Sequence, residues 1–101
     1  MRGPEASFED DLVAEAEADG WLSYKMTCLN RKGFPDRIFG KNGETVVMEI
    51  KRPWGRKGRG GSLSKSQINC HLELRLAFGW KVHVVETYEK GRRLLGLKGG
   101  T

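Results

Sequence analysis

Apolar residues recur with a helical period near the start of this chain. Phe8, Leu12 and Ala16 follow one another every four residues in a run rich in Ala and Glu. Such spacing places them on one stripe of a helix. The run begins at Pro4 and ends before Gly20, and Pro and Gly are favoured at those two ends of a helix. We therefore expect the first helix to fill this run.

Three stretches that follow have the composition or alternation of strands: 21–29, 36–40 and 44–51. The last two are joined by Asn42-Gly43, a strong hairpin signal, so they should pair antiparallel. Alternate side chains of a strand point to opposite faces. In the second arm one face carries Val46, Met48 and Ile50, and the other carries Val47, Glu49 and Lys51.

A second helix is predicted from Ser64 to Gly79. Ser64-Lys65-Ser66-Gln67 fits a capping box, and Gly79 is a natural stop. We expect one stripe of this helix to cover the sheet, and a second to meet the first helix or another subunit. The first stripe holds Gln67, Cys70, Leu74 and Phe78, and the second holds Ile68, Leu72 and Leu76. A strand over 80–88 and a short edge strand over 92–97 should follow.

This order, αβββαβ, predicts an α/β fold with a mixed β-sheet, flanked by a helix on each side or by both helices on one face. The 101 residues suit one domain over 1–101, with its core at about 5–88. No apolar stretch approaches the roughly 20 residues of a membrane span, and the N-terminus lacks a signal-peptide segment. We therefore expect a cytoplasmic protein with no membrane partner. Cys28 and Cys70, without ligand spacing, should be small buried side chains.

Charge is unevenly distributed along a chain whose formal net charge is +5. Residues 5–19 carry acids and no base, whereas 51–59 carry bases and no acid. A polyanion such as nucleic acid should therefore meet the second region. That region continues into a Gly-rich stretch, which is either a solvated connector or an anchor for the polyanion.

Glu49 and Lys51 interrupt an otherwise apolar strand, and burying such a pair costs several kcal/mol unless the charges are paired or bound. One alternative is an exposed pair on a half-solvated strand. However, Asp36 begins the other hairpin arm, and Glu5 and Glu9 fall on the apolar stripe of the first helix. Carboxylates that converge near a lysine repel one another unless a cation is present, and such oxygen ligands suit Mg²⁺ or Mn²⁺.

Pro35-Asp36, twelve further residues and then Glu49-Ile50-Lys51 resemble the PD-(D/E)XK nuclease signature. Together with KGFPDR (32–37), VMEIKRP (47–53) and LSKSQ (63–67), the pattern is similar to the VRR-NUC family, the virus-type replication-repair nucleases. The resemblance covers roughly residues 5 to 87. It implies a restriction-endonuclease-like fold and hydrolysis of DNA phosphodiesters by metal-activated water.

The resemblance also implies the site residues. The metal ligands would be Asp36, Glu49 and the backbone carbonyl of Ile50, and Lys51 would be the catalytic lysine. Gln67 would be the family's helix glutamine, with a role only as the third residue of its capping box as the alternative. The N-terminal acid would be Glu5, with Glu9 as the alternative. We expect DNA contacts from the bases after the signature: Arg52, Arg56, Lys57, Arg59 and Lys65.

Proteins of this family and size look like phage products that dimerise and cut branched DNA such as Holliday junctions. We therefore expect a homodimer in a bacterial or phage-infected cell, with the second helical stripe as its contact or as ordinary core. The rivals are a nuclease for flaps, nicks or unstructured DNA, and a non-catalytic DNA-binding module. His71 and His83 lack an acidic partner at diagnostic spacing, so surface or core roles are expected. Trp54 should pack or stack on a base.

Overall fold

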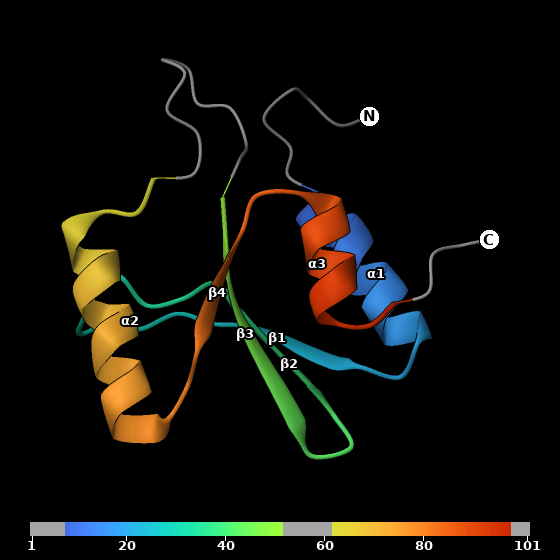
Figure 1. Cartoon of the computed structure of the whole chain (residues 1–101), viewed down its shortest axis with the longest axis horizontal. Coiled ribbons are helices and arrows are strands. Elements are labelled where there is room, and N and C mark those ends of the chain that lie inside the picture. Colours follow the sequence, from blue (N-terminus) through green and yellow to red (C-terminus); the bar gives the residue numbers. More distant parts are fainter. Residues whose placement is uncertain (1–7, 52–61, 98–101) are drawn as a thin grey trace.

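Four strands form one mixed sheet between two layers of helices (Figure 1). This computed structural model describes residues 8–51 and 62–97. The elements follow one another as α1 (Glu9–Ala18), β1 (Leu22–Lys25), β2 (Arg37–Lys41), β3 (Glu44–Ile50), α2 (Lys65–Phe78), β4 (Val82–Val85) and α3 (Tyr88–Leu94). The sheet has the order β1-β2-β3-β4, in which β4 is parallel to β3 and the other pairs are antiparallel.

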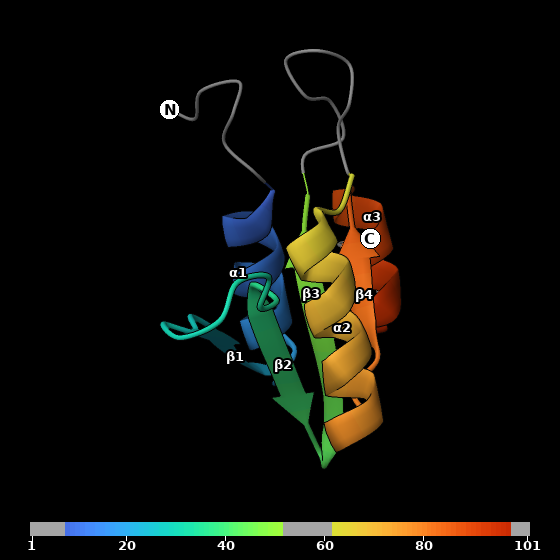
Figure 2. The same ribbon diagram turned by 90° about the vertical axis from the view of Figure 1, so that its left-hand side faces the viewer.

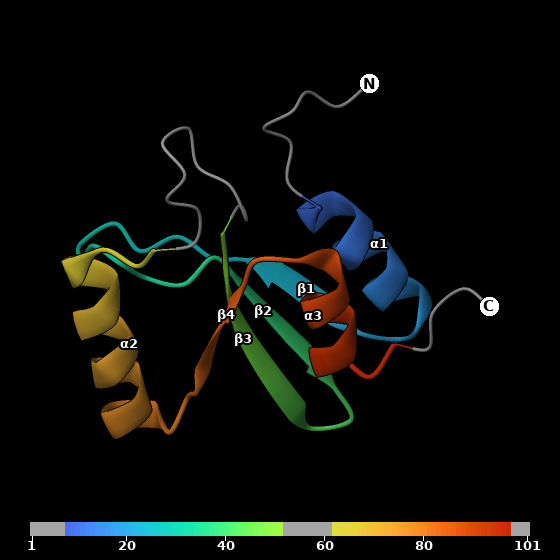
Figure 3. The ribbon, with the colours of Figure 1, turned by 45° about the horizontal axis from the view of Figure 1, so that its top comes forward.

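The helices cover both faces of the sheet. Figures 2 and 3 show α2 alone on one face and α1 with α3 on the other. The parallel pair β3 and β4 is joined through α2, as such a crossover requires. The predicted α/β class with a mixed sheet is thus confirmed, and of the two predicted arrangements the one with helices on each side is correct.

Local signals in the sequence act as predicted at the hairpin and at α2. Asn42 and Gly43 both have positive φ, 52° and 83°, which is the backbone of the tight turn that pairs β2 with β3. Ser64 caps α2 with the full capping box, and Gly79 ends the helix at a φ of 72°. Gly20, two residues after the end of α1, has a φ of 97°. The predicted start of that helix at Pro4 lies outside the described residues.

The predicted edge strand over 92–97 is wrong, because α3 runs to Leu94 and a turn follows it. The Thr87 side chain accepts a hydrogen bond from the Lys90 N–H (3.1 Å) and so caps α3. Gly91 lets this helix approach α1 closely, since a Cβ there would lie 2.6 Å from a methyl carbon of Leu12. With α3, the element order is αβββαβα. Leu95, just after α3, is buried in the core, so the core extends past residue 88.

The two faces of β3 are buried against different helices. Val46 and Met48 join Leu12 and Ala16 of α1 in the main core, while on the other face Val47 is buried with Cys70 and Leu74 of α2. Cys70 is buried as expected, and Cys28 is half-buried. The second stripe of α2 is exposed: Ile68 (49%), Leu72 (59%) and Leu76 (83%). Because α1 lies across the sheet, the predicted contact between this stripe and the first helix is wrong.

Within the ranges 8–51 and 62–97, no helix has the length and apolar character needed to cross a membrane.

Candidate active site

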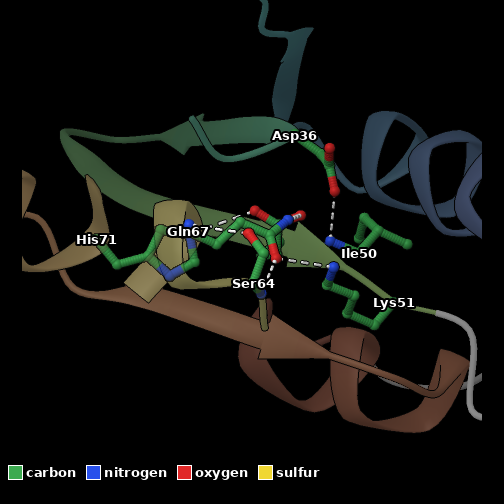
Figure 4. A network of polar contacts seen from close by, with 7 residues as sticks. Asp36, Ile50, Lys51, Ser64, Gln67 and His71 are labelled. Carbon is green, nitrogen blue, oxygen red and sulfur yellow. Dashed lines mark hydrogen bonds and ion pairs between the residues drawn. The ribbon is translucent and has the colours of Figure 1, made fainter. Parts of the chain in front are cut away.

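Asp36 is fixed beside the end of β3 by backbone hydrogen bonds. Its N–H donates to the Met48 carbonyl (3.1 Å), and its carbonyl accepts from the Met26 N–H (2.8 Å). Its carboxylate Oδ2 accepts a short bond of 2.7 Å from the Ile50 N–H (Figure 4). The hairpin therefore brings the two halves of the PD…EIK signature together across fourteen positions of sequence.

Glu49 is the one buried charged side chain in the described part of the chain, with only 3% of its surface exposed. Burial in this position, together with the charge of Asp36 and a hydrogen bond with it, raises the pKa of Glu49 to about 8. The Lys51 ammonium acts in the opposite direction and is the smaller effect. Asp36 and Glu49 thus form a close pair of carboxyls, of which Glu49 is buried and Asp36 half-buried.

Gln67 connects these acids to Lys51. Its Oε1 accepts from Lys51 Nζ (3.0 Å) and from the Ser64 N–H (2.9 Å), while its Nε2 donates to Glu49 Oε2 (3.0 Å). Lys51 is itself held at the end of β3, because its N–H donates to the Val85 carbonyl (2.9 Å). The predicted capping box is confirmed, and the same amide also bonds both charged residues (Figure 4).

Sequence reasoning missed the position of His71. Its Nε2 lies 3.3 Å from Glu49 Oε1, and 12% of its side chain is exposed. Burial and the nearby Lys51 charge lower the pKa of this imidazole. The available signal was helical, because His71 stands four residues after Gln67 and so projects from the same face of α2. His83, on β4, is half-buried and has a pKa lowered chiefly by burial.

The remaining predicted residues divide into those that the structure describes and those that it does not. Glu9 lies on α1, where its Oε2 accepts from Arg37 Nε at 2.7 Å. Lys65 is exposed at the first position of α2. Outside the described residues lie Glu5, Arg52, Trp54, Arg56, Lys57 and Arg59.

The described residues fit a divalent cation in their chemistry. Burial and the neighbouring Asp36 carboxyl both raise the pKa of Glu49, and a bound cation would offset both effects. Carboxylate oxygens are the donors that Mg²⁺ and Mn²⁺ prefer. In ranges 8–51 and 62–97 no three His, Cys, Asp or Glu side chains form a metal-holding group. A cation here would therefore rest on Asp36 and Glu49, with the Ile50 carbonyl and an N-terminal acid as further predicted ligands.

Comparisons with known proteins relate this chain to a nuclease in sequence and to a VRR_NUC domain in structure. A scan against models of protein families gives no match. In sequence, the chain is 31% identical over 86 residues to "Putative nuclease p44" of Acyrthosiphon pisum secondary endosymbiont phage 1, covering 84% of this chain and 85% of that protein. In structure, it resembles a solved VRR_NUC domain with a TM-score of 0.66 at 23% identity, covering 90% of this chain and 97% of that one. The structure also brings the signature residues together: Asp36, Glu49, Lys51 and Gln67. On the strength of this relative and this shared fold, the chain belongs to the VRR-NUC family.

Proposed function

We propose that this protein is a Mg²⁺- or Mn²⁺-dependent endonuclease that hydrolyses DNA phosphodiester bonds. The observation that carries the proposal is the cluster in which Gln67 bonds both Glu49 and Lys51 while Asp36 crowds the same carboxylate. Two acids, one lysine and one amide lie together near the C-terminal end of β3. Such groups can bind a phosphate and neutralise its charge while a bond to phosphorus forms. The nuclease name of the phage relative agrees with this chemistry.

A divalent cation held by Asp36 and Glu49 would supply charge neutralisation and acidification of water. The protein's own groups would do the rest. Lys51 places its ammonium 3.0 Å from the Gln67 oxygen, so its position relative to Glu49 is set before DNA binds. From there the ammonium would orient the attacking water and stabilise the growing negative charge on the phosphate oxygens. Gln67 would act mainly by holding the Lys51 ammonium at a fixed distance from the Glu49 carboxylate.

We propose that DNA approaches over the basic residues that follow Lys51 in sequence, namely Arg52, Arg56, Lys57, Arg59 and Lys65. Such side chains contact phosphates without reading bases. Each phosphate contact contributes to the salt dependence of binding. Neutralising Arg56, Lys57 and Arg59 together should flatten the dependence of DNA affinity on salt, measured by fluorescence anisotropy on an uncleavable substrate. An unchanged slope would show that these residues do not anchor DNA.

The proposed assembly is a homodimer that cuts branched DNA such as four-way junctions. The exposed stripe of α2 borders an apolar groove of about 490 Å³ between α2 and β4, lined partly by Leu63, Leu72 and Trp80. Exposed apolar surface of this kind marks interaction sites. A two-fold contact there would give two active sites for two strands of a symmetric junction.

The test is a cleavage assay with Mn²⁺ and with Mg²⁺ on a four-way junction, a flap, a nicked duplex and a linear duplex. Asp36→Ala, Glu49→Ala and Lys51→Ala should each abolish cleavage, whereas Glu44→Ala, exposed at the other end of β3, should not. Cleavage that survives all three substitutions would contradict the catalytic proposal. Binding of DNA without any cleavage would identify a DNA-binding module, and equal cleavage of every substrate would reject the selectivity for branches.

A further inference from the structure

His71 contacts the carboxylate oxygen of Glu49 that Gln67 does not. Gln67 Nε2 donates to one carboxylate oxygen, Oε2, at 3.0 Å, while His71 Nε2 lies 3.3 Å from the other, Oε1. The two side chains come from successive turns of α2 and so from one rigid element. A carboxylate held at one oxygen can still rotate about its last torsion, which is a soft one. Held at both oxygens, it has a fixed plane.

We propose that His71 is a positioning residue for the nuclease reaction, and that its imidazole sets the plane of the Glu49 carboxylate that receives the divalent cation. The inference rests on the proposed function, and it names a residue for that same site. In the ionised form that would receive the cation, the Glu49 carboxylate can only accept hydrogen bonds, so the contact then requires the proton of His71 on Nε2. Partners of this kind, which touch a ligand and not the metal, commonly change metal affinity or activity by about 10- to 100-fold when removed.

The surroundings of His71 favour this role over direct binding of the cation. Within the described ranges the histidine does not complete a group of three side chains that could hold a metal. The ring contacts Glu49, which is 3% exposed, while it also lines the open groove between α2 and β4. Because one side of the ring faces that groove, a smaller side chain at 71 should leave room for water and no closed cavity. The fold should therefore tolerate substitutions at this position.

The experiment compares wild type with His71→Ala, His71→Gln and Asn69→Ala, the last an exposed control on the same helix. Calorimetry on metal-free protein gives Mn²⁺ affinity, and cleavage of a four-way junction is measured over a Mn²⁺ series. His71→Ala should weaken Mn²⁺ binding about 10- to 100-fold and raise the Mn²⁺ needed for half-maximal cleavage by a similar factor. His71→Gln, whose amide can still donate to Glu49, should recover most of the loss. Asn69→Ala should match wild type.

The outcomes separate this inference from the proposed function. Mn²⁺ affinity within about twofold of wild type in His71→Ala would overturn the role of His71 and leave the nuclease proposal standing. Equal losses in His71→Ala and in His71→Gln would also overturn it, because a donor alone should suffice. If wild type binds Mn²⁺ but cuts none of the DNAs, the nuclease proposal fails and calorimetry still decides on His71. If wild type neither binds Mn²⁺ nor cuts DNA, both proposals fail.

Discussion

Lys51 donates a 3.0 Å hydrogen bond from Nζ to Gln67 Oε1, although 16 positions separate the two residues in the chain. The lysine directly follows β3, and the glutamine lies in the first turn of α2. Because the same amide donates to Glu49, the spacing between the ammonium and the carboxylate depends on where α2 begins. The cap of a helix and the geometry of a candidate active site are therefore set by one side chain.

Substitutions in the capping box should separate these two roles of Gln67. Ser64→Ala removes the side-chain cap and should cost about 1 kcal/mol of stability, with cleavage changed by less than about threefold. Gln67→Ala should cost somewhat more stability and should lower the cleavage rate about 10- to 100-fold, because hydrogen bonds to charged groups are worth about 1.5–3 kcal/mol. Urea unfolding and single-turnover cleavage measure the two effects. Equal loss of cleavage in both variants would mean that Gln67 matters only as a cap.

Gly33 should be essential for the contact between the β1–β2 connection and α2. It has a φ of 88°, and a Cβ there would lie 2.3 Å from the backbone oxygen of Ser66. Gly43 is the matched control, since its φ of 83° is similar and a Cβ there would meet nothing within 4 Å. Gly43→Ala should cost about 1 kcal/mol of backbone strain, and Gly33→Ala about 1–3 kcal/mol more from overpacking. Thermal unfolding of both variants would measure this difference in stability. Equal losses in the two variants would mean that the β1–β2 connection shifts to accommodate the added methyl group.

The sequence was enough to predict the parts of this structure that local chemistry determines. The Asn42-Gly43 turn, the Ser64 cap and the alternation along β3 each follow from a few neighbouring residues, and each is confirmed. The alternation also placed Glu49 and Lys51 together, and the hairpin then placed Asp36 beside them.

Contacts between distant elements were not predictable in the same way. The stretch 92–97 resembled an edge strand because RRLLGL lacks a clear helical stripe, and its helix depends on packing against α1 instead. Arg92 Nε donates to Glu15 Oε1 at 2.9 Å, and the Tyr88 hydroxyl donates to the same oxygen. His71 was missed for a similar reason, because its acidic partner is 22 positions away on another element.

The exposed stripe of α2 makes a prediction about assembly. If the homodimer forms there, Leu72→Lys should place a charge in its centre and shift the protein toward monomer. Leu29→Lys is the control, because Leu29 is 97% exposed in the β1–β2 connection and does not line the groove between α2 and β4. Sedimentation at several concentrations measures the effect. A wild type that is monomeric throughout, or a Leu72→Lys protein that associates as strongly as wild type, would reject this interface.

The two candidate N-terminal acids should behave differently. Glu9 accepts a 2.7 Å bond from Arg37 Nε, and 17% of its side chain is exposed, so Glu9→Gln should mainly lower stability, by about 1–3 kcal/mol. Glu5→Gln should lower Mn²⁺ affinity and cleavage, if Glu5 is the ligand that the family pattern implies. Calorimetry with Mn²⁺ and urea unfolding of both variants measure this. The reverse pattern would make Glu9 the ligand.

Stability without metal should fall as the pH rises through the range in which Glu49 ionises. The folded protein raises the pKa of this carboxyl from its ordinary 4.5 to about 8, so it binds the proton more tightly than the unfolded chain does. The contribution is therefore complete below pH 4.5 and is lost between pH 4.5 and pH 8. At about 1.4 kcal/mol per pH unit, the loss amounts to at most about 5 kcal/mol.

Glu49→Gln isolates this effect, because the variant keeps Asp36, Lys51 and His71, the other charged or titratable groups that face position 49. Its stability should lack the decline between pH 4.5 and pH 8, so that the variant exceeds wild type at the upper end. The lowered pKa of His71 opposes folding only toward acid pH and acts in both proteins. Added Mn²⁺ should restore the stability of wild type at pH 8 and do little for the variant. Urea unfolding across this range with chelator and then with Mn²⁺ measures each difference, and parallel curves for the two proteins would contradict the assignment of the shift to Glu49.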